Sequence, residues 1–495
     1  MTQPDSLLET AAINDVRVPA LLRQYAVHGF LVALACAYYL LNAQILLGHY
    51  DLGWHLAAGD WIRDHGRLPL HDPWSFTAGD KPWLNLSWLW DVLASVIFQH
   101  AGLGGLLSLT VICGGAITFY LASICLRTGA SAAAACIAVL FASLLYPAFS
   151  AFPNIYLAAA PNMATMLFAV LFYGECLGRT KRVLLLPLVM LAWANLHGGF
   201  LLGLFILGVF GGLALRKRDW AGFSLYGLAT AGSLAATLIN PLGWHIYQGV
   251  TSTMGNFVQA QITEWWPYYR NITMPGSLPG MAYMLAFVAL ELRDRRLGVL
   301  EARLLSWLFL VLGLYQFRYM AFFFLFSAVL MTLHLDRLLS PGLRDPRIGR
   351  SWLAAATLAV SALSLACWRA AASPLELPQM LSRQDVRYLQ SHFPHARLLN
   401  HWNYGGILIF YTRGTPPLFV DGRAATAYPD ALLHDYFQLS QPEVDEAAWN
   451  RVLAKYRIDT VLWVKAHDAL RRYLVGRKGW KEAYDGQYAS IYFKP

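Results

Sequence analysis

The sequence predicts a polytopic α-helical membrane protein of about eleven transmembrane helices, followed by a C-terminal extracytoplasmic α/β domain. Of its 495 residues, 57% are hydrophobic and only 14% are charged, whereas about a quarter of the residues in a soluble domain are charged. The deficit falls in apolar runs between residues 28 and 371, and their length is typical of bilayer spans. From about residue 374 the composition returns to that of a soluble domain, so the second unit is predicted over 374–495.

The distribution of basic residues predicts the orientation of the spans. The predicted spans are 28–48, 103–126, 131–151, 158–177, 183–197, 198–215, 221–240, 278–292, 299–316, 317–335 and 352–371. Arg and Lys cluster before the first span and in every second loop thereafter, which by the positive-inside rule makes residues 1–27 a cytoplasmic N-terminus. Those residues show no cleavable signal pattern, so the first span is expected to remain as an anchor. The C-terminal domain is then expected outside the cell or in the periplasm.

One apolar segment, 84–99, is excluded from this count. It is short and contains Asp91, and counting it as a crossing would place every later basic cluster on the wrong side. We therefore expect a juxtamembrane or re-entrant helix there, within a first extracytoplasmic loop that covers 50–101.

Charge and cysteine usage exclude two other classes. The net charge of +9 comes from short loops between spans, so it reports topology and predicts no nucleic-acid partner. The cysteines all lie in apolar runs without metal-ligand spacing, and we expect core fillers without a disulfide framework. They are Cys36, Cys113, Cys125, Cys136, Cys176 and Cys367.

The last 120 or so residues are large enough to form a core of their own. Helices are predicted over 384–392, 430–439 and 445–455, and strands over 397–401, 406–411, 418–420, 460–464 and 487–493. This alternation is typical of an α/β domain.

Polar residues that are rare in membrane proteins gather on the predicted outer face. They lie in the stretch 51–91, the hairpin at 197–199, Asn240-Pro241, the loop 242–277 and the turn at 316–319. Non-helical backbone at bilayer depth is tolerated where it lines a cavity. These features together predict an outward-facing site.

Asp51 directly follows the first span. It is placed to act as a general base or to hold a divalent cation, Mg²⁺ or Mn²⁺, and the alternative is a helix cap. His55 lies one turn later on the same helical face, so we expect a hydrogen-bonded pair with Asp51 rather than half a metal site. Asp72 is a candidate second acid or a turn starter. Trp54 is a candidate for stacking on a sugar ring or an interfacial anchor.

Three further candidates come from other segments. His197 at a Gly-Gly turn suits a phosphate or hydroxyl contact, or a turn-stabilising role. The guanidinium of Arg318 suits a phosphate headgroup, and the alternative is a structural arginine that snorkels to the interface. Glu264 is open between a site acid and an interfacial charge. The chain has no nucleotide-binding loop, nucleophile elbow or zinc-protease motif.

With these residues in view, the sequence resembles the C-type glycosyltransferase superfamily, and within it a set of bacterial membrane proteins. The likeness covers nearly the whole chain. It is carried by Asp51, His55-Leu56, Gly59, Trp61-Ile62, His65-Gly66, Pro69, Asp72-Pro73, Ser75-Phe76-Thr77 and Pro82-Trp83, and by the phrases at 193–199, 240–243, 262–265 and 421–423.

The resemblance implies a protein of the bacterial inner membrane that transfers a sugar, with inversion, from a polyprenyl-phosphate donor. The acceptor would be a glycan, a lipid or a protein, and membrane lipids surround the chain. The family's first-loop acid corresponds to Asp51, and its phosphate-contacting basic residue best corresponds to Arg318. Many members have two acids at this point, whereas Leu52 and Gly53 follow Asp51 here. That departure argues for metal-independent catalysis by Asp51 assisted by His55.

Two other readings remain open at this stage. A lipid-linked polysaccharide polymerase or ligase would need several outer-face arginines at span ends, and Arg318 is the main one found. A transporter or non-catalytic assembly protein of the cell envelope would show polar residues or broken helices at mid-bilayer, which are scarce here.

Overall fold

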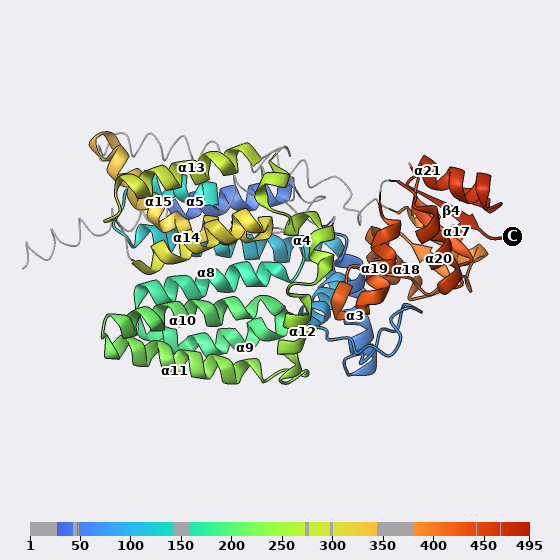
Figure 1. Ribbon diagram of the computed structural model, residues 1–495. Helices are drawn as coiled ribbons and strands as arrows, with labels where there is room; N and C mark the ends of the chain where they lie inside the picture. Colours follow the sequence, from blue (N-terminus) through green and yellow to red (C-terminus); the bar gives the residue numbers. More distant parts are fainter. Residues whose placement is uncertain are drawn as a thin grey trace, which may run out of the picture.

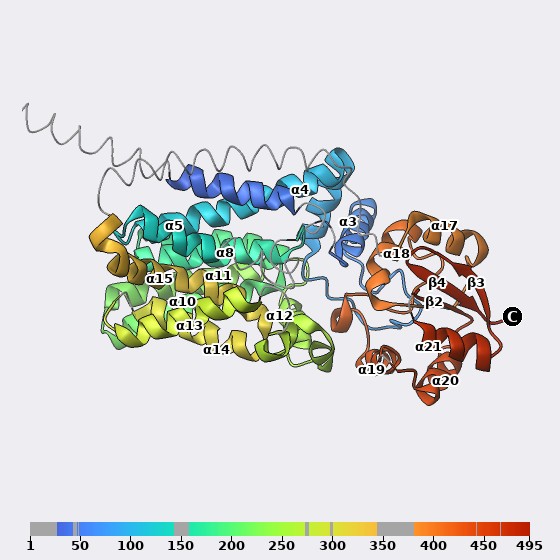
Figure 2. The ribbon, with the colours of Figure 1, turned by 90° about the horizontal axis from the view of Figure 1, so that it is seen from above.

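The computed structural model describes residues 27–42, 47, 49–142, 158–272, 277–297, 300–343, 381–441, 443–465 and 467–495. The described helices before residue 344 form an elongated bundle, and the C-terminal part of the chain lies at one end of it (Figures 1 and 2). The stretch that includes α3 (Leu52–His65) joins the two. The predicted span 352–371 and Cys367 lie outside the described residues.

The bundle is built from apolar helices that run side by side (Figure 1). They are α4 (Trp88–Leu126), α5 (Ala132–Leu140), α8 (Asn162–Gly178), α9 (Leu186–Leu196), α10 (Leu201–Arg216), α11 (Trp220–Thr237), α13 (Ser277–Arg293), α14 (Leu300–Tyr315) and α15 (Met320–Leu343), with a further helix over Val27–Leu41. The short α12 (His245–Thr253) lies at the bundle end that faces the C-terminal part.

Three segments are long and apolar enough to cross a membrane among the described residues, Trp88–Leu126, Gly198–Arg216 and Phe317–Leu339. Val27–Leu41 and Asn162–Gly178 are shorter apolar helices. The helical membrane character is thus confirmed, while the count of about eleven spans stays a prediction, because helices such as α9 are shorter than the ~20 residues a full crossing needs. The side of the membrane that each end faces also stays a prediction.

Helix α4 bends at Gly102, whose φ of 58° and ψ of −154° are accessible mainly to glycine. The bend separates the predicted juxtamembrane segment from the predicted span 103–126. On its first leg, Trp90 and Ala94 pack with Leu52 and Leu56 of α3 in a small buried cluster. The segment that the charge pattern excluded from the spans is therefore a distinct leg that supports the first loop.

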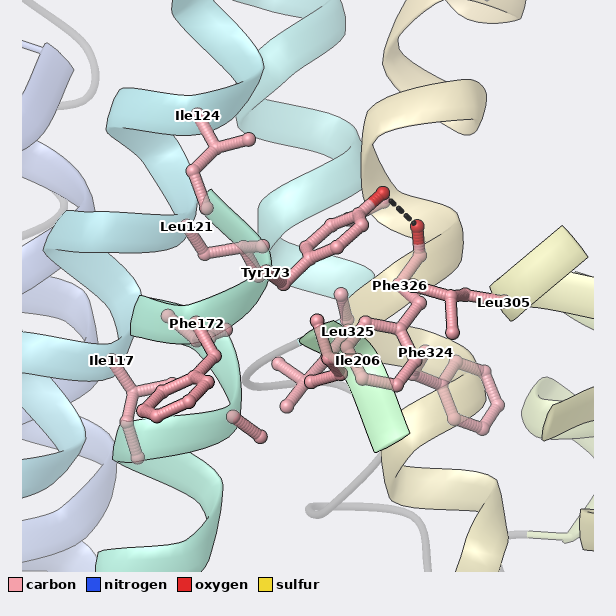
Figure 3. Close-up of a cluster of buried hydrophobic side chains, with 14 of the residues drawn as sticks. Ile117, Leu121, Ile124, Phe172, Tyr173, Ile206, Leu305, Phe324, Leu325 and Phe326 are labelled. Carbon is pink, nitrogen blue, oxygen red and sulfur yellow. Dashed lines mark hydrogen bonds between the residues drawn. The ribbon is translucent and has the colours of Figure 1, made fainter. Parts of the chain in front are cut away.

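The bundle core interlocks α4, α8, α10, α14 and α15 through fully buried side chains (Figure 3). Phe172 and Tyr173 of α8 lie between Leu121 of α4 and Phe326 of α15, and the Tyr173 hydroxyl donates to the Phe326 carbonyl oxygen at 3.0 Å. Inside a bilayer, close packing and hydrogen bonds between helices supply the cohesion that the hydrophobic effect supplies in water.

The C-terminal part holds a four-stranded sheet with the order β1-β2-β4-β3. Its strands are β1 (Leu398–Asn400), β2 (Thr460–Val464), β3 (Lys481–Asp485) and β4 (Ala489–Phe493). β1 pairs with β2 in parallel, and the other pairings are antiparallel. Its helices are α17 (Arg383–His392), α18 (Gly405–Thr412), α19 (Asp430–Leu439), α20 (Glu446–Lys455) and the short α21 (Asp468–Arg471).

Most elements predicted here are confirmed, with two exceptions. The strand predicted over 406–411 is wrong, because the segment forms the buried helix α18; a short apolar run without periodicity is compatible with either structure. The segment 418–420 forms no strand of the sheet and makes an isolated bridge from Leu418 to Ser75. Strand β3 was not predicted, since its sequence is polar and largely exposed.

The core of the C-terminal part also includes residues of the first loop. Trp54, Trp74 and Trp83 belong to the same buried cluster as Tyr404 and Phe419. Part of the stretch 51–91 therefore packs into the core of the C-terminal unit, although nearly three hundred residues of sequence separate the two.

Candidate active site

Asp51 stands at the N-cap position of α3, yet its side chain makes no capping hydrogen bond. The helix-cap alternative is therefore not what the structure shows. Its carboxylate lies 3.9 Å from His49 Nδ1 and is 30% exposed, and its backbone N–H donates to the same ring nitrogen at 3.2 Å. The carboxylate is thus held loosely beside an imidazole and remains accessible.

His55 does not form the predicted side-chain pair with Asp51. Its ring is buried, and Nδ1 lies 2.5 Å from Oδ1 of Asp91 on α4. The Asp91 carboxylate also accepts from Asn85 Nδ2 at 2.7 Å and Ser87 Oγ at 3.4 Å. Asp51 precedes the first helical residue, while the His55 ring contacts α4, so the shared helical face does not bring the two side chains together. Trp54 stacks on the His55 ring with centroids 3.6 Å apart.

His197 lies between α9 and α10 in a defined hydrogen-bond network. The Trp193 indole N–H donates to Thr165 Oγ1 at 2.8 Å, and Thr165 Oγ1 lies 2.7 Å from His197 Nδ1. The Gly199 N–H also donates to Nδ1, at 3.3 Å. Because Nδ1 accepts from that backbone N–H, the neutral ring carries its proton on Nε2, which makes Nε2–H a donor.

The electrostatic surroundings keep His197 neutral. Burial, the positive charge of Arg318 and the neighbouring His55 together lower the pKa of His197 to about 3. An uncharged N–H donor beside a fixed guanidinium can bind an oxyanion without having to lose or gain a proton.

Arg318 and Glu264 come together from separate loops at the same end of the bundle. Arg318 Nη1 lies 3.3 Å from Glu264 Oε1, with the two side chains 27% and 25% exposed. The guanidinium also stacks over the Trp265 ring, 3.9 Å from its centroid. This contact orients the arginine and leaves most of its N–H donors available.

His49 connects these groups electrostatically. Burial lowers the pKa of His49, the carboxylates of Asp51 and Glu264 raise it, and His55 lowers it. Arg318 and His55 likewise shift the pKa of His197. One electrostatic neighbourhood therefore contains Asp51, His55, Glu264, Arg318 and His197. These are five of the residues that the sequence singled out.

Asp72 is the exception. Its side chain is fully buried, its oxygens accept from the Trp74 and Ser75 backbone N–H groups at 3.0 and 3.2 Å, and Oδ1 lies 2.8 Å from Arg423 Nη1. The carboxylate is engaged inside the protein, so its prediction as a substrate contact is corrected to a structural role.

Trp54 keeps one unusual feature. Its ring is 8% exposed, and the indole Nε1 is buried without a hydrogen-bond partner among the described residues. Buried indole N–H groups usually find a partner. The ring lies against His55 and Trp83, and stacking of Trp54 on a sugar ring stays a prediction.

No group of three His, Cys, Asp or Glu side chains is arranged for a metal ion in the part of the chain that the structure describes. At the cation site predicted from the sequence, the potential ligand beside Asp51 among the described residues is His49. These two side chains do not make a cation site on their own, so no step below is routed through a metal.

The molecule is similar to two groups of solved structures. One is the archaeal oligosaccharyltransferase AglB from Archaeoglobus fulgidus in complex with an inhibitory peptide and a dolichol-phosphate, with a TM-score of 0.56 and 12% identity over 89% of this chain and 70% of that chain. The other is ArnT from Cupriavidus metallidurans bound to undecaprenyl phosphate, with a TM-score of 0.51 and 14% identity over 93% and 96%. The chain shares its fold with AglB and ArnT, as the resemblance in its sequence predicted.

The apo state of the same ArnT matches over 96% of this chain and 98% of that chain, with a TM-score of 0.50 and 16% identity. Neither a scan of protein-family models nor a search of curated protein sequences found a match. At these identities the likeness establishes the fold, and the activity has to be argued from the site.

Three residues around the candidate site were missed from the sequence. His49 directly precedes the Tyr50-Asp51 pair, and its position next to a span end was a usable signal. Asp91 was noticed only as an anomaly in an apolar segment, although a buried acid of that kind requires a partner. Thr165 carried no signal, because its role depends on the contact of α8 with the turn at His197.

Proposed function

We propose that the protein is an integral membrane glycosyltransferase that moves a sugar from a polyprenyl-phosphate donor to an acceptor hydroxyl or amine on the extracytoplasmic face, with inversion. The observation that carries the proposal is that a part-exposed carboxylate, Asp51, a guanidinium, Arg318, and an imidazole, His197, share one electrostatic neighbourhood. The solved neighbours were captured with dolichol-phosphate and undecaprenyl phosphate, which supports a lipid phosphate as the donor's leaving group.

In the proposed reaction Asp51 takes the proton of the acceptor as the acceptor atom attacks the anomeric carbon. The bond from that carbon to the phosphate oxygen breaks on the opposite face, and its electron pair leaves with the lipid phosphate. Arg318 and the His197 Nε2–H stabilise the charge that develops on the phosphate. A phosphate is already a good leaving group, so a base, a cation and accurate placement suffice.

The other predicted residues support these three. Glu264 orients Arg318 through their 3.3 Å contact. His55 is held by Asp91, and Trp54 lies against the His55 ring. We assign these side chains to positioning and substrate contact.

The test is Asp51→Asn, which keeps the size of the side chain and removes the base. Membranes that contain the wild-type protein should release undecaprenyl phosphate from an undecaprenyl-phosphate sugar in the presence of cell-envelope acceptors, as measured by mass spectrometry. We expect the variant to lose about 10²–10⁴-fold in rate, with unchanged membrane insertion.

Asp64→Asn is the matched control, because Asp64 lies on the same helix with an exposed side chain. It should retain the wild-type rate. Full activity of Asp51→Asn would remove Asp51 from the role of base.

A further inference from the structure

The turn at Asp421-Gly422-Arg423 lies directly against the Asp51 carboxylate. A Cβ atom added to Gly422 would overlap Asp51 Oδ1 and lie 3.0 Å from its Cγ. Gly422 is not among the glycines with positive φ. What the turn requires at this position is therefore space for a carboxylate rather than an unusual backbone conformation.

Close contacts at three further glycines fix the backbone around Asp51. A Cβ on Gly406, at the start of α18, would overlap the carbonyl oxygen of Tyr50, and a Cβ on Gly53 would overlap the carbonyl oxygen of Gly406. A Cβ on Gly405 would in turn overlap the Cβ of Asp421. The residues on both sides of Asp51 are thus in direct backbone contact with the C-terminal part.

The turn that carries Gly422 is itself fixed by a buried ionic cluster. Arg423 donates from Nε to Asp421 Oδ1 at 2.8 Å and from Nη2 to Asp421 Oδ2 at 2.6 Å, and Tyr428 OH donates to Asp421 at 2.5 Å. Arg423 Nη1 lies 2.8 Å from Asp72, and all three charged side chains are fully buried. The guanidinium also lies over Trp74 and Trp83, 4.9 and 4.6 Å from the ring centroids.

A buried arginine with two carboxylates has a single low-energy arrangement, because any displacement leaves a charge without a partner in the interior. Asp421 and Arg423 flank Gly422, so the position of its backbone is determined from both sides. Asp72 belongs to this cluster, so its ion pair with Arg423 joins the first loop to the turn.

We propose that Gly422 is a positioning residue that seats the Asp51 carboxylate, so that the C-terminal part completes the catalytic site. The inference rests on the proposed function, in which Asp51 is the base. A rigid glycine surface restricts the rotamers of Asp51 and aims it at the acceptor without supplying a competing hydrogen-bonding side chain.

Gly422→Ala tests the catalytic side of the inference. The added methyl group must displace the carboxylate, and displacement of a reacting group by about 1 Å costs about 10²-fold in rate. We expect that loss in turnover, measured as undecaprenyl phosphate released, while the affinity for undecaprenyl phosphate itself stays at its wild-type value. Gly476→Ala is the control, since a Cβ at Gly476 meets nothing within 4 Å.

A stability cycle tests the contact independently of any activity. Gly422→Ala should lower the thermal unfolding temperature, and Asp51→Ala, which vacates the space, should restore it in the double variant. Equal loss in both backgrounds, including failure of both to fold, overturns the inference.

The two experiments separate the inference from the function on which it rests. Coupling in the stability cycle together with an active Asp51→Asn would keep the contact and retire Asp51 as base. Coupling together with wild-type turnover in Gly422→Ala would overturn the positioning role.

Discussion

A buried charge cluster around Glu291 in the helix bundle differs from the part-exposed charged pairs near Asp51. At the end away from the C-terminal part, the Glu291 carboxylate is buried and lies 2.9 Å from His334 Nε2 and 2.7 Å from Arg303 Nε. Trp307 Nε1 adds a third donor at 3.4 Å. At the end that faces the C-terminal part, Arg318 meets Glu264 at 3.3 Å and Asp51 meets His49 at 3.9 Å, and these four side chains remain 21–30% exposed.

The difference separates structural charge from functional charge. A buried ion without partners is too costly to keep, so the Glu291 cluster is closed and has no capacity left for a ligand. The groups around Asp51 have one loose partner each and access to solvent, which is the condition for exchanging that partner for a substrate. Mutation of a charged residue is therefore expected to lower stability at the Glu291 cluster and to weaken substrate binding near Asp51.

The largest effect on stability is expected at the closed cluster. Glu291→Gln removes the counter-charge of Arg303, whose side chain is 22% exposed, and changes the hydrogen-bond partner of the buried His334. Removal of one member of a buried ion pair costs about 3–5 kcal/mol. The free energy of unfolding in detergent should fall by that amount. Turnover per folded molecule should not change, because Glu291 lies near the C-terminal end of α13, and α13 ends on the side of the bundle away from the C-terminal part (Figure 1).

Glu301→Gln is the matched control for this prediction. Glu301 pairs with Lys217 at 2.5 Å, but the lysine side chain is 47% exposed. Loss of such a surface pair costs about 1 kcal/mol or less. If both variants lost the same small amount of unfolding free energy, the distinction between the buried Glu291 cluster and an exposed ion pair would fail.

A smaller effect, on binding rather than stability, is expected at the open cluster. Arg318→Gln removes the guanidinium and should weaken binding of undecaprenyl phosphate by about 10–100-fold, corresponding to the loss of a charge-assisted contact of roughly 1.5–3 kcal/mol. Its stability should change by less than about 1 kcal/mol, because the pair with Glu264 is part exposed.

Arg270→Gln provides the comparison. Arg270 lies at the same end of the helix bundle as Arg318 and also lies over a tryptophan, with its Cζ 5.7 Å from the Trp266 centroid. It is not among the charged groups that shift the pKa of His49 or of His197. Binding of the lipid phosphate should remain at the wild-type level. An equal loss in both variants would indicate a general effect of positive charge rather than a site at Arg318.

Hydropathy made the helical membrane class predictable, because a bilayer admits few backbone structures and demands long apolar runs. The residues around the site were predictable for a related reason, since Arg318, Glu264 and His197 are anomalies next to apolar segments. Which side chains contact one another around the site was not predictable. His55 meets Asp91 and Asp72 meets Arg423 across long separations in sequence, and no local period reports such contacts. Helix α18 was missed because its short sequence is apolar almost throughout and therefore shows no helical periodicity.

The last prediction concerns the protonation of His197. Its folded pKa of about 3 is below the ordinary value of about 6.5, so between these pH values the unfolded chain binds a proton that the folded chain does not. The contribution of His197 to the free energy of unfolding is therefore present above about pH 6.5 and is lost as the pH falls toward 3. In His197→Asn, which keeps a hydrogen-bond acceptor near the position of Nδ1, the unfolding temperature should depend less on pH between 6.5 and 4 than in the wild type. The exposed His245 supplies the control His245→Asn, whose pH dependence should match the wild type. A His197→Asn slope equal to the wild-type slope would mean that His197 is protonated in the folded protein, and the open cluster would then hold two cations for the phosphate instead of one.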